Sequence, residues 1–210
     1  MPRVFPSFRD AEGIEHTLTF QERVSKNLLL FKALDEQSQE VCAKFVYRPY
    51  GEEVHRLLSH EGMAPKLLGV SRIGDGPTMI VMEMLNDPWQ TLYTFVQINS
   101  RWRVDGVQAA IHKRLEDILA KLNAGGVVHG DFRANNVMVK PGEEELAVLI
   151  DFDWAGKAGE VHYPLDRNHI GIQWPGQAGS AISVGDDRST FKIQWAKLVT
   201  QQFFIAPFYV

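Results

Sequence analysis

Two short apolar segments that each lead into an aspartate constrain the fold of this chain more than any other feature. The first, VHGDFRANNVMV, covers residues 128–139, and the second, LIDFDW, covers residues 149–154. Asp131 precedes Asn136 by five residues, and Asp151 follows the second apolar run. Carboxylate and amide oxygens suit Mg²⁺, which takes the rest of its coordination shell from water and substrate phosphates. The pattern therefore predicts a divalent-cation site at the ends of two strands.

The bulk composition is that of an ordinary globular protein. The 210 residues are 45% hydrophobic and 23% charged, which is enough apolar material for one domain or two small lobes. The formal net charge of −4 argues against a nucleic-acid partner. No run of about 18 apolar residues and no apolar leader is found, so we expect neither a membrane partner nor secretion. The single cysteine, Cys42, excludes an internal disulfide. We expect a cytoplasmic protein, with a nuclear location as the alternative.

Hydrophobic periodicity divides the chain into a strand-rich part and a helical part. The first part has strands predicted over 17–24, 28–34, 40–47, 66–71 and 78–85, and a helix over 50–62. The break at Asn86–Pro88 marks a boundary. The second part has helices predicted over 105–124 and 187–202, and short strands over 127–128, 137–140 and 146–150. The predicted organisation is a flexible arm over residues 1–16, a first lobe over 17–85 and a second lobe over 86–210.

Lys44 lies within the apolar segment VCAKFV and is the best candidate to balance the charge of a phosphate. The alternative is that its side chain extends from an edge strand toward water. The segment Arg101–Arg103, which contains Trp102, is interpreted as an exposed loop rather than a substrate contact.

The pair HGDFRANN and IDFD resembles the catalytic core of the protein-kinase-like superfamily. It is closer to the aminoglycoside-phosphotransferase and choline-kinase branch, where HGD replaces HRD and DFD or DFE often replaces DFG. The stretches YGEEVHRLL, MIVMEML and IQWP also resemble small fungal kinase-like proteins. This resemblance, over roughly residues 41–187, implies an α+β, two-lobed protein-kinase-like fold. Its N-lobe is small and β-rich, and its helical C-lobe is reduced.

The resemblance also implies the catalytic and metal-binding residues. Asp131 falls on the aspartate that accepts or orients the proton of the acceptor hydroxyl. Asn136 and Asp151 fall on the magnesium ligands. Arg133 falls where many kinases place a cation that contacts the transferring phosphate, and His129 falls on a mainly structural histidine. Asp131, Arg133 and Asn136 are thus the predicted catalytic residues.

The resemblance implies the nucleotide-binding residues as well. Lys44 would contact the α- and β-phosphates while paired with Glu53, for which Glu52 is the rival. Cys42, two residues before Lys44 on the same strand face, would line the roof of the adenine pocket. The hinge, whose backbone would bind adenine, falls on Met82, Glu83, Met84 and Leu85.

Three departures from the kinase pattern bear on activity. The connection RVSKN before Lys44 contains no glycine for close approach to phosphates, so backbone amides near Ser25 and Asn27 would have to serve. Gly130 replaces the arginine of HRD, so switching by loop phosphorylation is not expected. The segment after Asp151 is short and lacks an APE motif, which disfavours a peptide-phosphorylating kinase. Within it, Asp186 or Asp187 is expected to brace the backbone of the catalytic loop, which the resemblance places on HGDFRANN (residues 129–136).

Two functions follow from these features. The first is an ATP- and Mg²⁺-dependent phosphotransferase that transfers the γ-phosphate to a hydroxyl of a protein or a small molecule. The alternative is a pseudokinase, a nucleotide-binding or regulatory module without turnover. The absent glycine loop and short C-lobe favour the alternative, whereas the complete set of cleft residues favours the enzyme. The apolar tail QQFFIAPFYV suits a packed terminus or an interface with a protein partner.

Overall fold

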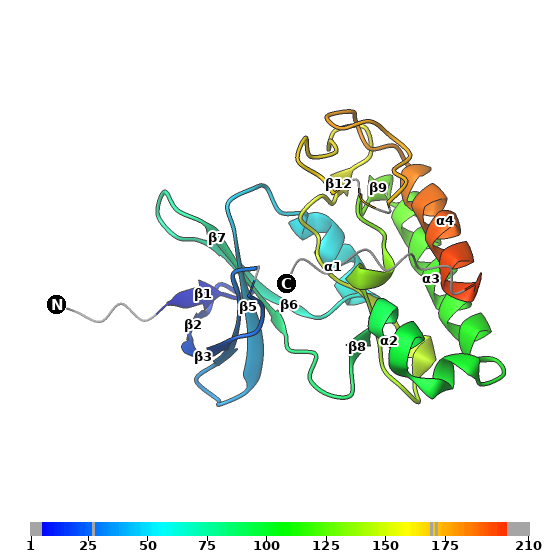
Figure 1. Cartoon of the computed structure of the whole chain (residues 1–210). Helices are drawn as coiled ribbons and strands as arrows, with labels where there is room; N and C mark the ends of the chain where they lie inside the picture. Colours follow the sequence, from blue (N-terminus) through cyan, green and yellow to red (C-terminus); the bar gives the residue numbers. More distant parts are fainter. Residues whose placement is uncertain (1–5, 27, 169, 171, 201–210) are drawn as a thin grey trace.

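The computed structural model describes residues 6–26, 28–168, 170 and 172–200 of the chain. A β-rich lobe and a helical lobe lie side by side (Figure 1). This arrangement confirms the predicted α+β, two-lobed fold. The predicted lobe boundary at residues 85 and 86 falls in the connection between β7 and β8.

The N-lobe is an antiparallel five-stranded sheet with the order β3-β4-β5-β7-β6. Its strands are β3 (Thr19–Arg23), β4 (Leu30–Leu34), β5 (Glu40–Val46), β6 (Leu67–Arg72) and β7 (Thr78–Glu83). Helix α1 (Glu52–His60) connects β5 to β6. Cys42 pairs with Met82, and Lys44 pairs with Ile80. The register therefore places the two candidate nucleotide contacts of β5 beside the strand that leads into the hinge.

Part of the predicted N-terminal arm is a hairpin. Strands β1 (Ser7–Arg9) and β2 (Glu15–Thr17) pair antiparallel, so residues 7–9 and 15–16 of the predicted arm belong to a hairpin. Phe8 is buried and stacks on His16. A Cβ atom on Gly69 of β6 would lie 2.4 Å from the Phe8 ring, so the glycine provides the space for it. The hydrophobic burial of Phe8 holds the hairpin against the sheet.

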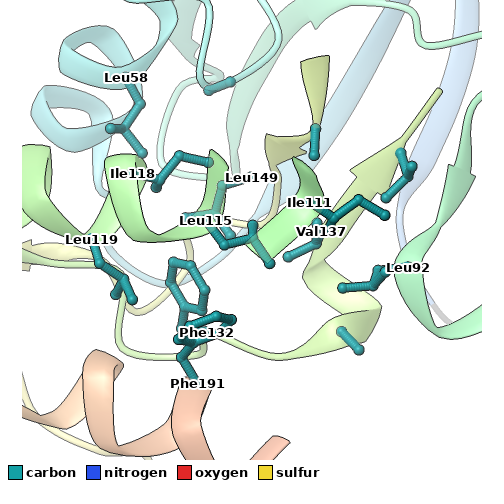
Figure 2. Packing of buried hydrophobic residues seen from close by; sticks show 14 of the residues in the cluster. Leu58, Leu92, Ile111, Leu115, Ile118, Leu119, Phe132, Val137, Leu149 and Phe191 are labelled. Carbon is teal, nitrogen blue, oxygen red and sulfur yellow. The ribbon is translucent and has the colours of Figure 1, made fainter. Parts of the chain in front are cut away.

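The C-lobe is built around helix α3 (Val107–Ala124), with α2 (Leu92–Ile98) and α4 (Asp186–Thr200) packed near it. Its short strands are β8 (Gln90–Thr91), β9 (Val127–Val128), β10 (Val137–Val139), β11 (Val148–Leu149) and β12 (Gly156–Lys157). Figure 2 shows Leu115 and Leu119 of α3 beside Phe132 of the catalytic loop and Phe191 of α4. This core fixes the catalytic loop to α3. The residues that end the predicted last helix, 201 and 202, and the apolar tail lie outside the described part of the chain.

Helix α2 and the segment after it were missed by sequence reasoning. The Thr91 hydroxyl accepts a hydrogen bond from Thr94 N at 3.1 Å and caps α2, which is too short to show a clear helical period. Trp102 is 1% exposed and packs against Phe95 and Trp195, so the prediction of an exposed loop is wrong at this residue. No described helix is both long and apolar enough to cross a membrane.

Candidate active site

A cleft of about 390 Å³ between the lobes brings together most of the predicted nucleotide-binding residues. Cys42 and Lys44 line it from the N-lobe, and Asn136 and Asp151 line it from the C-lobe. All four predicted hinge residues line it too: Met82, Glu83, Met84 and Leu85. The connection between β3 and β4 contributes Ser25, whereas Asn27 is outside the described residues. The cleft surface is mainly apolar near the hinge and charged near Asp151, which suits a base at one end and phosphates at the other.

Asp131, Arg133 and Asn136 form one connected group on the catalytic loop. Arg133 binds both carboxylate oxygens of Asp131, with Nη2 at 2.6 Å from Oδ2. Asn136 Nδ2 donates to the Asp131 carbonyl at 2.9 Å and to its Oδ2 at 2.8 Å. The Asp131 carboxylate is therefore fixed in orientation before any substrate binds.

Backbone-directed contacts hold this loop in place. Asp187, at the start of α4, accepts hydrogen bonds from His129 N at 2.6 Å and Gly130 N at 2.9 Å. Gly130 has φ of 80°, and a Cβ there would lie 3.0 Å from the backbone oxygen of Trp154. The His129 ring contacts the Ile150 carbonyl at 3.0 Å, as the structural role assigned to it requires. Of the two aspartates expected to brace the loop, Asp187 is the one that does so.

Lys44 forms a compact charged cluster with both aspartates of the DFD sequence. Its Nζ lies 2.5 Å from Asp151 Oδ1 and 2.5 Å from Asp153 Oδ1. Burial acts to lower the pKa of Lys44, yet the two carboxylates raise it above its ordinary value. Burial acts to raise the pKa of Asp151, but Lys44 holds it below the ordinary value. Burial, with the charge of Asp151 added, raises the pKa of Asp153. Lys44 is thus charged, and Asp151 is the more acidic of its two partners.

The predicted ion pair between Lys44 and Glu53 is not formed. Glu53 is exposed on α1, and its rival Glu52 pairs with Arg56 at 2.8 Å. The first turn of α1 is held instead by its backbone, because Gly51 N donates to Phe152 O at 3.0 Å. A Cβ on Gly51 would lie 2.6 Å from Ala155, so only glycine permits this approach. The resulting helix orientation directs Glu53 toward solvent.

Helix α1 presents His55 to the site in place of a glutamate. The His55 ring stacks on Phe152 with centroids 4.4 Å apart, and its nitrogens contact Tyr50 Oη at 2.7 Å and Pro65 O at 2.9 Å. Burial lowers the pKa of His55 to about 4. Lys44 Nζ lies over the Tyr50 ring, 5.9 Å from its centroid. A neutral histidine and an aromatic ring therefore support the Phe152 and Lys44 side chains.

The donor set of the cleft fits a magnesium ion shared with phosphates. Both hydrogen bonds of the Asn136 amide use Nδ2, which leaves the carbonyl oxygen Oδ1 as a ligand atom. Asp151 adds a carboxylate in the same cleft. Throughout the described residues, no group of three His, Cys, Asp or Glu side chains is placed to hold a metal alone. Mg²⁺ suits such a site, because it commonly binds one or two protein oxygens together with substrate phosphates.

Sequence reasoning did not assign three residues that shape the site: Tyr50, His55 and Asp153. The second aspartate of DFD is visible in the sequence, but its contact with Lys44 depends on how two lobes meet. His55 gives no sequence signal, because a buried histidine and a surface histidine on a helix look alike.

Comparison with known proteins agrees with this geometry. A family model described as "Phosphotransferase enzyme family" matches residues 82–158, which contain the hinge, the catalytic loop and the DFD sequence. The structure of vaccinia related kinase 3 superposes with a TM-score of 0.61 at 17% identity, covering 94% of this chain and 68% of that one. The kinase PK-1 of Cydia pomonella granulovirus superposes with a TM-score of 0.68 at 16% identity, covering 92% and 71%. No curated protein matches the chain in sequence. The chain therefore has a protein-kinase-like fold.

Proposed function

We propose that this chain is an ATP- and Mg²⁺-dependent phosphotransferase that transfers the γ-phosphate to a hydroxyl group. The observation that carries the proposal is the single site formed by Lys44, Asp151 and the Asp131–Asn136 pair. These residues come from both lobes and from three separate segments of the chain. A kinase-like phosphotransferase is the class that both the family match and the fold support.

The residues of the site suit the demands of phosphoryl transfer, which are mainly positioning and charge neutralisation. Asn136 and Asp151 would hold Mg²⁺, which when bound neutralises phosphate charge. Lys44 would exchange part of its contact with the aspartates for the nucleotide phosphates. Asp131 would orient the acceptor hydroxyl and accept its proton as the new O–P bond forms and the bond to the β-phosphate oxygen breaks.

A nucleotide-binding module without turnover is the second candidate, and one observation favours it. The connection that covers the phosphate end of the cleft has no glycine and places Val24 and Leu28 in the cleft lining. Apolar side chains at this position replace the close backbone approach that a glycine loop provides. Measured turnover decides between the two candidates.

A thermal shift and a turnover assay test the proposal together. Mg²⁺-ATP should raise the melting temperature of the wild type, and Asp151→Asn should reduce this rise because it removes a metal ligand. Asp131→Ala should lower ATP turnover about a thousand-fold while Mg²⁺-ATP still binds. Asp117→Asn, which removes an exposed carboxylate on α3, is the matched control and should behave as wild type.

Two results would count against the enzyme. Binding without any turnover in the wild type would leave the nucleotide-binding module as the function. No thermal shift at millimolar Mg²⁺-ATP would remove both candidates.

A further inference from the structure

Arg167 is a buried arginine with two nitrogens that find no partner among the described residues. It lies in the segment between β12 and α4 and is 8% exposed. Its Nη2 donates to Gly176 O at 2.6 Å. Across the described residues, its Nε and Nη1 have no hydrogen-bond partner. An arginine is always charged and all its nitrogens are donors, so leaving donors buried and unpaired is costly unless an anion or water satisfies them.

Aromatic rings hold this guanidinium in place without using its hydrogen-bonding edges. Its central carbon lies 4.6 Å from the centroid of the Tyr163 ring and 5.5 Å from that of Trp174. Trp154 also packs against both rings, which completes an aromatic cluster of Trp154, Tyr163 and Trp174. Such stacking orients an arginine without using its edge donors.

The nearby carboxylates are engaged elsewhere. Asp166 pairs with Arg48 at 2.8 Å, and Asp186 accepts from Tyr163 Oη at 3.1 Å and from Ser183. Asp187 is occupied by the two catalytic-loop amides. None of these contacts neutralises Arg167. The residues on either side of it, Asp166 and Asn168, are exposed, so the segment lies at the protein surface.

The aromatic cluster connects Arg167 to the catalytic aspartate. The Arg133 guanidinium lies over the same Trp174 ring, 5.5 Å from its centroid, and binds the Asp131 carboxylate. Neither Arg167 nor Trp174 lines the nucleotide cleft. Arg167 is therefore close to the catalytic residues but outside the space for ATP, which is where an acceptor must lie.

We propose that Arg167 binds an anionic group of the acceptor, so that the acceptor is a small hydroxyl compound carrying a phosphate or a carboxylate. The role of the bound compound as the acceptor rests on the proposed phosphotransferase function, whereas anion binding at Arg167 does not. Arg133 is already engaged by Asp131, so the unpaired donors of Arg167 are the ones available to the anion. The hydroxyl of the same compound would then reach Asp131.

The anion site is tested by titration with inorganic phosphate at constant ionic strength, followed through tryptophan fluorescence. Trp154 and Trp174 lie in the cluster and report on it directly. Arg167→Gln should weaken phosphate binding at least about tenfold, because it removes the charge-assisted hydrogen bonds. Arg167→Lys should weaken phosphate binding less, because lysine keeps the positive charge and loses only the planar donor geometry of the guanidinium. Acetate as a second probe separates preference for a carboxylate from preference for a phosphate.

Two control variants locate the bound phosphate. Arg114→Gln removes an arginine that donates to the backbone carbonyls of Ala147 and Gly62, which are not part of the cluster, and this variant should bind phosphate as wild type does. Lys44→Met removes the cation of the nucleotide cleft and should also retain phosphate binding. Phosphate binding that survives Arg167→Gln, or that is lost only in Lys44→Met, overturns the proposal.

A measurement on the wild type covers the case in which Arg167→Gln does not fold. The Nε–H NMR resonance of Arg167 is assigned as the arginine resonance that is missing from the Arg167→Lys spectrum. Phosphate should shift this resonance in the wild type, and unchanged arginine resonances overturn the proposal. Failure of the anion-site proposal can be told apart from failure of the phosphotransferase proposal, because Mg²⁺-ATP binding is measured separately by thermal shift. Arg167→Gln should leave that shift unchanged.

Discussion

The catalytic loop and helix α1 both pack against the DFD segment, yet they are held there by different kinds of contact. The catalytic loop is fixed by one carboxylate, Asp187, that receives two backbone amides. Helix α1 is fixed by a ring stack between His55 and Phe152 and by the backbone bond from Gly51 to Phe152. The loop contact uses a buried carboxyl group at the start of a helix, whereas the α1 contact uses an imidazole ring, an aromatic ring and a backbone amide.

This difference separates the contacts of the site that are local in sequence from those that depend on tertiary packing. Asp131 and Asn136, whose roles the resemblance implies, are five residues apart in one motif, so their contact is nearly local in sequence. A pair between Lys44 and Glu53 forms only if the strand, the connection after it and the rotation of α1 about its axis together point the two side chains toward each other. The close approach of Gly51 to Ala155 sets that rotation, and no spacing rule contains it.

Loss of the Asp187 brace should have the largest effect on stability. Asp187→Ala removes the acceptor of two buried amides, so we expect the free energy of unfolding to fall by about 3 kcal/mol. Urea denaturation measures this change. Asp186→Ala, its neighbour with a more exposed set of contacts, is the matched control and should cost less than half as much. Equal losses for both variants would show that Asp187 acts only as a helix-start residue.

The α1 contact should make stability depend on pH with a sign opposite to that of the loop contact, because burial lowers the pKa of His55 but raises the pKa of Asp187. The pKa of His55 is about 4 in the folded chain, against an ordinary value of 6.5. Between these values the unfolded chain binds a proton that the folded chain excludes. The free energy of unfolding should therefore fall by about 3 kcal/mol as the pH decreases from above 6.5 toward 4, and the slope that His55 contributes fades as the pH rises above 6.5.

The contribution of His55 is isolated by comparing denaturation across this pH range in wild type and His55→Phe. Phenylalanine keeps a ring against Phe152 but does not titrate, so the variant should lose most of the slope. His60→Gln, an exposed position on the same helix, should retain it. Identical slopes in wild type and His55→Phe would mean that other groups cause the pH dependence.

Sequence patterns predicted much of this fold and the part of the site that lies within continuous motifs. The five N-lobe strands, α1 and α3 follow from hydrophobic periodicity, and the hinge and the catalytic loop follow from the resemblance that the HGD and DFD segments carry. Asp153 and His55 did not follow, because each gains its role from burial against a distant segment. Arg167 is the extreme case, since its sequence neighbours are exposed while its own side chain is buried.

Substitution of Glu53 should have the smallest effect on the free energy of unfolding. It tests most directly whether neutral groups, rather than an ion pair, hold α1 at the site. If the neutral contacts of α1 have taken the place of a lysine–glutamate pair, Glu53→Gln should change the free energy of unfolding by less than about 0.5 kcal/mol. It should also leave the Mg²⁺-ATP thermal shift unchanged. Glu52→Gln, which loses an exposed pair with Arg56, should cost a similarly small amount, about 0.3 kcal/mol. A thermal shift lost in Glu53→Gln but kept in Glu52→Gln would mean that α1 rotates when nucleotide binds and brings Glu53 to Lys44. In that case the contact between Lys44 and the two aspartates would belong to the nucleotide-free state alone.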